Sequence, residues 1–81
     1  MRLEFTTEPF DLDEPPAHVR AGREVVEGGG FDTVDVGPFG TTAEGSEQAV
    51  AEAVGRLVRS TVAAGATRIS LQVSVLGEEP R

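Results

Sequence analysis

The sequence predicts an α+β fold with the element order β-α-β-β-α-β, in which a four-stranded antiparallel sheet carries both helices on one face. Three short segments alternate between apolar and polar residues with the period of a half-buried strand, and a fourth is rich in small and β-branched residues. Two further segments repeat apolar residues at helical spacing. Two split β-α-β units in this order form the ferredoxin-like sandwich.

The predicted strands cover residues 1–7, 31–36, 39–44 and 67–75. Only Gly37 and Pro38 separate the second from the third, so these two are expected to form a hairpin. Alternation divides the strand residues between the two faces of the sheet. The helix-facing side is expected to hold Leu3, Phe5, Val34, Val36, Ile69, Leu71 and Val73. The open side is expected to hold Glu4, Thr6, Thr33, Asp35, Ser70, Gln72 and Ser74.

The first predicted helix spans residues 15–27, with Asp13 or Glu14 as its cap, and ends at the glycines 28–30. Its core stripe is expected to include Val19, Gly22 and Val26. The second helix begins after Gly45 or Ser46 and ends at Gly65. Its expected core stripe consists of Val50, Ala53, Val54, Leu57, Val58 and Val62.

Length and composition limit the classes of function. The 81 residues are enough for a single domain over positions 1–81, with a frayed tail at 76–81. Fourteen acidic residues against seven arginines and no lysine give a net charge of −7, which disfavours nucleic acids and anionic membranes and leaves cationic or neutral small ligands. No segment is typical of a signal peptide or a membrane span, and there is no cysteine, so a cytoplasmic protein is expected.

The small core and the open side both favour association between copies. A domain of this size buries only about 60–65% of the surface of its unfolded chain, so a second subunit would add needed burial. The short polar side chains of the open side suit contact with another sheet or with a ligand. We therefore expect a homo-oligomer, either a dimer or a tetramer, joined through the sheet faces.

No motif in the sequence predicts catalysis, a metal site or a cofactor. Gly40 and Gly45 have the spacing of a phosphate loop, but Ser46 and Glu47 stand where that loop needs Lys followed by Ser or Thr. His18 is the single histidine and is expected at the surface. Ligand clusters with metal-binding spacing are absent from the sequence, and no nucleophile, base and orienting group can be assembled.

Two short motifs resemble the small thiamine-binding protein family, the YkoF-like proteins. The first is the G-T-x-x-E-G turn formed by Gly40, Thr41, Glu44 and Gly45, preceded by Pro38. The second is the Gly-Ala-x-Arg sequence, with Gly65, Ala66 and Arg68, that leads into the last strand. The resemblance is strongest between positions 34 and 75.

This resemblance implies a ferredoxin-like fold, association through the sheets, and non-catalytic binding of thiamine or its hydroxymethylpyrimidine half for storage, delivery or sensing. The carboxylate of Glu44 and the side chains of Thr42 and Gln72 are candidates to read the aminopyrimidine edge. Phe5 or Phe39 is a candidate to stack on a ring. The candidate ligand-binding residues are Glu44, Thr42, Thr41, Gln72, Phe39, Phe5 and Thr6.

Two other classes of function remain open at this point. One is an oligomeric regulatory or association module of the same fold with no affinity for thiamine. The other is a small enzyme whose active site forms between subunits. For Glu44 itself, the alternative to a ligand contact is a favourable position near the N-terminus of the second helix, worth about 0.3–1 kcal/mol.

Overall fold

The computed structural model of the chain describes residues 1–10, 13–37 and 40–76. Its elements follow the predicted order. They are β1 (Arg2–Glu8), α1 (Ala17–Glu27), β2 (Thr33–Val36), β3 (Thr41–Glu44), α2 (Glu47–Ala63) and β4 (Arg68–Ser74). Apart from Leu76, the tail expected to be frayed lies outside the described residues.

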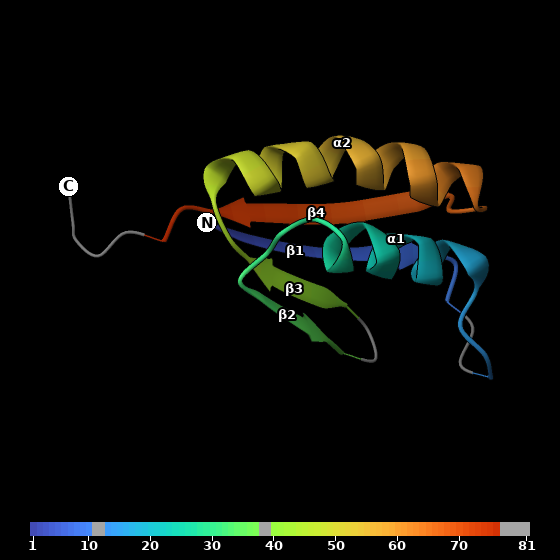
Figure 1. The fold of residues 1–81 in the computed structure, drawn as a ribbon. Coiled ribbons are helices and arrows are strands. Elements are labelled where there is room, and N and C mark those ends of the chain that lie inside the picture. Colours follow the sequence, from blue (N-terminus) through green and yellow to red (C-terminus); the bar gives the residue numbers. More distant parts are fainter. Residues whose placement is uncertain (11–12, 38–39, 77–81) are drawn as a thin grey trace.

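The four strands form one sheet in the order β2-β3-β1-β4, and each neighbouring pair is antiparallel. Both helices lie on one face of this sheet, and β2 and β3 form the expected hairpin (Figure 1). The architecture is therefore the predicted ferredoxin-like sandwich. It has two layers, with the core between the sheet and the helix pair.

The core lies under the middle of the helix layer, where the two central strands meet both helices. Burial along β1 alternates strictly, with Leu3 and Phe5 inside. The buried cluster consists of Leu3, Phe5, Val26, Ala43, Val50, Ala53 and Leu57. β1 and β3 occupy the middle of the sheet, so their helix-facing residues receive the best cover.

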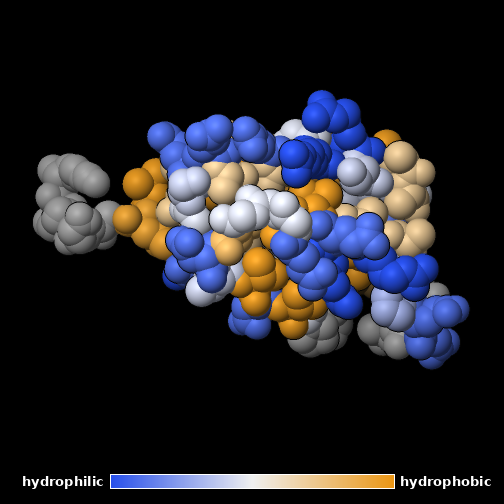
Figure 2. All heavy atoms as spheres, viewed as in Figure 1, coloured by the Kyte–Doolittle hydropathy of each residue, from blue (hydrophilic) through white to orange (hydrophobic). Residues whose placement is uncertain are grey.

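The two edge strands are less well covered than the alternation predicts. By register, Val34 and Val36 of β2 and Leu71 and Val73 of β4 share the helix-facing side with Leu3 and Phe5, but each is at least 36% exposed. They lie on the predicted side of the sheet, but the helices leave them partly exposed. The helices pack chiefly against each other and leave the sheet margins open. Figure 2 shows hydrophilic side chains over α2 and apolar surface around the end of β4.

Helix α1 begins two residues later than predicted, because Pro16 is its N-cap. The Pro16 carbonyl accepts hydrogen bonds from the amides of Val19 and Arg20, at 3.0 and 3.3 Å. The proline side chain cannot cap, and the predicted capping residues Asp13 and Glu14 lie further upstream.

His18 is the clearest departure from the sequence prediction. Its side chain is 2% exposed, not at the surface, and it bridges two segments. Nε2 lies 2.9 Å from the Pro9 carbonyl oxygen, and Nδ1 lies 2.7 Å from the Thr7 hydroxyl. A carbonyl only accepts, so Nε2–H donates to Pro9 and Nδ1 accepts from Thr7. This pair of bonds ties α1 to the end of β1.

Helix α2 is capped by Ser46, whose side chain accepts a hydrogen bond from the Ala49 amide at 3.1 Å. It ends before Gly65, which has a φ of 109°. Neither helix in the described part of the chain is long and apolar enough to cross a bilayer.

The buried stripe of α2 differs from the expected one at its C-terminal half. Thr61 is buried, and its hydroxyl donates to the Leu57 carbonyl at 2.6 Å, so the group is satisfied inside the core. Val58 and Val62, expected in the core, are 46% and 55% exposed. The buried stripe of α2 continues from Leu57 to Thr61, and both valines lie beside it on the helix surface.

Leu57→Ala should destabilise the fold by about 2–5 kcal/mol, because it opens a cavity at a fully buried position. Urea denaturation followed by circular dichroism measures the loss. The control is Arg56→Ala at the exposed neighbouring position, where a change within about 0.5 kcal/mol is expected. Equal effects would mean that α2 is rotated away from the orientation described.

Thr7→Val should cost about 1–3 kcal/mol, because it preserves the shape of a buried side chain but leaves Nδ1 of His18 without its donor. Thr67→Val is the matched control. Its exposed hydroxyl donates to the Glu8 carbonyl at 3.3 Å, and its loss should change stability by under about 0.5 kcal/mol. Indistinguishable unfolding midpoints for the two variants would contradict the role given to His18.

Candidate ligand-binding site

The open face of the sheet is organised in rows that run across the strands. The register places Asp35 opposite Thr42, Thr42 opposite Glu4, and Glu4 opposite Gln72. Residues directly opposite each other point to the same side of an antiparallel sheet. One row therefore spans all four strands, with the Glu4 carboxylate near its middle.

A shallow hollow of about 330 Å³ lies over this central row and the next one. Its lining residues come from β1, β3, β4 and the position just before β3: Glu4, Phe5, Thr6, Gly40, Thr41, Thr42, Ser70, Leu71 and Gln72. The open-side members have short or medium side chains.

Gly40 contributes to the hollow by lacking a side chain. A Cβ at this position would come within 3.0 Å of Cγ2 of Thr6 and 3.3 Å of the Phe5 carbonyl oxygen. Thr6 is paired with Ser70 on its other side. The row formed by Gly40, Thr6 and Ser70 therefore carries only small side chains.

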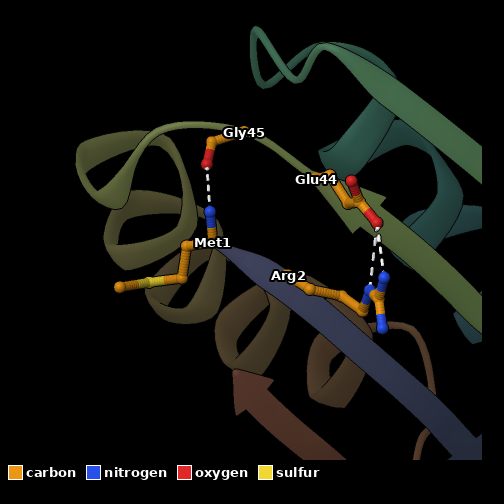
Figure 3. A network of polar contacts seen from close by, with 4 residues as sticks. All are labelled: Met1, Arg2, Glu44 and Gly45. Atoms are coloured by element: carbon orange, nitrogen blue, oxygen red, sulfur yellow. Dashed lines mark hydrogen bonds and ion pairs between the residues drawn. The ribbon is translucent and has the colours of Figure 1, made fainter. Parts of the chain in front are cut away.

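The neighbouring row on the other side of Glu4 contains an ion pair between Arg2 and Glu44. Nε and one terminal nitrogen of Arg2 donate to Oε2 of Glu44 at 3.0 and 2.9 Å (Figure 3). The Met1 amino group and the Gly45 carbonyl form a further bond at 2.8 Å beside it. The Glu44 carboxylate is thus engaged with Arg2 at the border of the hollow and does not line it.

The structure brings together most of the predicted site residues, but in two different roles. Thr6, Thr42 and Gln72 present their side chains on the open face, and all line the hollow. Thr41 and Phe5 are opposite each other on the helix-facing side, so they border the hollow from within the sheet. Phe39 lies outside the described residues.

A stacking role for Phe5 does not agree with its position. The residue is 7% exposed, and its ring approaches Gly22 of α1, where an added Cβ would lie 3.0 Å from Cε2. The ring fills the core beneath α1. It therefore cannot lie against a ligand on the opposite side of the sheet.

Glu4 and Ser70 are lining residues that the sequence analysis placed on the open face without assigning them to the site. The signal for Glu4 was its place in the middle of the first strand, but its neighbours depend on the register. Arg2 and Glu44 form a salt bridge and neutralise each other. No arginine lines the hollow with Glu4, and Arg2, two residues away on the same face, is paired with Glu44.

This arrangement can accept hydrogen bonds from a ligand and balance a positive charge. A carboxylate accepts only, a threonine hydroxyl donates or accepts, and a glutamine amide does both. The described part of the chain holds no group of three His, Asp or Glu residues placed to bind a metal ion. His18 is buried on the other side of the sheet and does not reach the hollow.

Comparison with known proteins gives one informative likeness. A solved structure described as a domain of unknown function, DUF77, from Bacillus cereus is similar with a TM-score of 0.60 and 25% sequence identity. The match covers 88% of this chain and 68% of that one. No family model and no curated protein matches the sequence. The likeness supports the α+β, ferredoxin-like fold class.

Proposed function

We propose that this chain binds thiamine, or the hydroxymethylpyrimidine half of thiamine, on the open face of its sheet without converting it chemically. The observation that carries the proposal is the hollow in which Glu4 stands between Thr42 and Gln72. The bound compound would be stored, delivered or sensed in the cytoplasm. The lack of cysteine agrees with a reducing compartment.

Charge supports a cationic ligand. The thiazolium ring of thiamine is permanently positive, and the chain carries a net charge of −7. Glu4 supplies a carboxylate at the hollow itself. A hydrogen bond to such a charged group contributes about 1.5–3 kcal/mol, which is enough to orient a small ligand.

The polar pattern of the central row supports an aminopyrimidine. Its exocyclic amine donates and its ring nitrogens accept, so it needs a mixed set of partners. Glu4 accepts, whereas the Thr42 hydroxyl and the Gln72 amide can supply donors. These three side chains are neighbours in one row, which matches the flat edge of a single ring.

The hollow is shallow and open to solvent rather than an enclosed pocket, and this supports a homo-oligomer. Small-molecule sites commonly bury 70–90% of a ligand, which needs walls on more than one side. A second sheet face laid over the first would supply them, in a dimer or a tetramer. The ligand would then lie between two copies of the Glu4 row.

An association module without thiamine affinity is the second candidate. The observation that favours it is the exposed apolar surface at the sheet margin, where Leu71 and Val73 remain 38% and 43% exposed. Such surface is typical of a subunit contact. Such a module would form an oligomer but would give no heat with thiamine.

Glu4→Gln should weaken thiamine binding at least tenfold, about 1.4 kcal/mol, because it removes the charge in the hollow and keeps the shape. Isothermal calorimetry measures the change. Glu8→Gln is the matched control. It makes the same change on the same strand and face, about 13 Å away, and should bind as wild type does.

A third variant, Glu44→Gln, tests whether Glu4 or Glu44 supplies the carboxylate that binds thiamine. It should disturb the contact with Arg2 and leave thiamine affinity within about twofold, because Glu44 does not line the hollow. A large loss in Glu44→Gln together with none in Glu4→Gln would move the site to the Arg2 row. The absence of saturable binding by the wild-type chain would favour the association module.

Thiamine binding should weaken severalfold when the salt concentration rises from about 0.05 to 0.5 M, because ions screen the partly open Glu4 carboxylate. Hydroxymethylpyrimidine has no fixed charge, so its affinity should stay nearly constant over the same range. Paired calorimetric titrations give both slopes. Equal slopes would contradict a charge contact with the thiazolium ring.

A further inference from the structure

We propose that the outer edge of β4, together with the neighbouring flank of α2, is a contact surface for a second copy of this chain. The two β4 strands would pair antiparallel across a twofold axis and join two sheets edge to edge. This contact is distinct from association through the open faces, and it does not depend on thiamine binding.

The two edges of the sheet differ in the features that keep edge strands from pairing. Natural edges are protected by shortness, proline, bulges or charged side chains. β2 has four residues and carries Asp35. β4 has seven residues in an unbroken register with β1, contains no proline, and carries its one charge, Arg68, at its first position. β4 is therefore the unprotected edge.

When two copies of β4 are paired antiparallel, residues of similar polarity lie opposite each other over the middle of the strand. With Leu71 on the twofold axis, Leu71 would lie opposite the partner's Leu71, Ile69 opposite the partner's Val73, and Ser70 opposite the partner's Gln72. The helix-facing side of the joint would then be wholly apolar, and the open side would be polar, with Arg68 opposite the partner's Ser74 at each end. Such self-complementarity is what a twofold contact requires.

The flank of α2 extends this surface. α2 contacts β1 while α1 contacts β2, so α2 covers the half of the sheet that ends in β4 (Figure 1). Val58 and Val62 are four residues apart and lie on one side of the buried stripe. Their exposure means that α1 does not cover them. In the proposed contact they form the flank toward β4, where the second α2 would pack.

Charge explains why copies of an acidic chain would meet here. The chain has 14 acidic residues, yet positions 53–76 contain no aspartate or glutamate and three arginines, Arg56, Arg59 and Arg68. Most of the remaining surface would repel a second copy. The C-terminal half of α2 and the whole of β4 form the region where two copies approach without facing each other's carboxylates.

Edge pairing leaves the candidate ligand site open. Two four-stranded sheets would form one sheet of eight strands, with both Glu4 rows on the same face. A second such pair, laid over that face, would give a tetramer with twofold symmetry at both contacts. The two kinds of contact are thus compatible and can be broken separately.

Analytical ultracentrifugation of the wild-type chain and three variants tests the proposal. Val62→Glu and Leu71→Glu place a carboxylate in the apolar joint and should each halve the assembled mass at about 50 µM protein. Ala63→Glu is the matched control, since it adds the same charge at the adjacent exposed residue on another side of α2 and should keep the wild-type mass.

Hydrogen exchange adds a readout that does not depend on mass. The β4 amides that point away from β1 should exchange slowly in the wild type and in Ala63→Glu, and at least tenfold faster in Val62→Glu, with circular dichroism unchanged. Val62 is exposed in the single chain, so this variant keeps its fold even if Leu71→Glu does not. A monomeric wild type, wild-type mass in Val62→Glu, or equal dissociation of Ala63→Glu would each overturn the proposal.

Discussion

The pairing of β1 with both of its neighbours is the constraint on which the rest of the structure depends. β1 is hydrogen-bonded to β3 on one side and to β4 on the other, and its register sets every row of the sheet. Each end is fixed by side chains as well. Arg2 meets Glu44 at the first residue, and Thr7 meets the buried His18 near the last. A slip by one residue would turn Glu4 into the core and Leu3 out of it.

The fold was accessible from the sequence because its signals are local. Alternation with period two identifies the strands and their faces, and apolar residues at helical spacing identify α2. How far a helix buries a given residue is not encoded locally in the sequence. Whether Val58 packs inside depends on where α2 lies over the sheet, and α2 packs chiefly against α1. The same holds for His18, whose partners Thr7 and Pro9 belong to a different element.

The candidate site was predictable in its composition but not in its arrangement. Thr6, Thr42 and Gln72 could be assigned to the open face from alternation alone. Which carboxylate stands beside them is a question of register between segments some 40 residues apart, and no periodicity encodes it. The glycine-rich turn drew attention to Glu44, whose partner is Arg2. Glu4, in an ordinary alternating strand, occupies the place beside Thr42 and Gln72.

The distribution of charge assigns different partners to different surfaces. A net charge of −7 opposes association between copies, so any contact between them must exclude carboxylates or neutralise them. The edge formed by β4 and the flank of α2 excludes them. The open face does not, because Glu4 stands on it, and two such faces brought together would place like charges opposite each other. A cation held between them would remove that repulsion, so a positively charged ligand would stabilise the face-to-face contact. The edge contact needs no ligand.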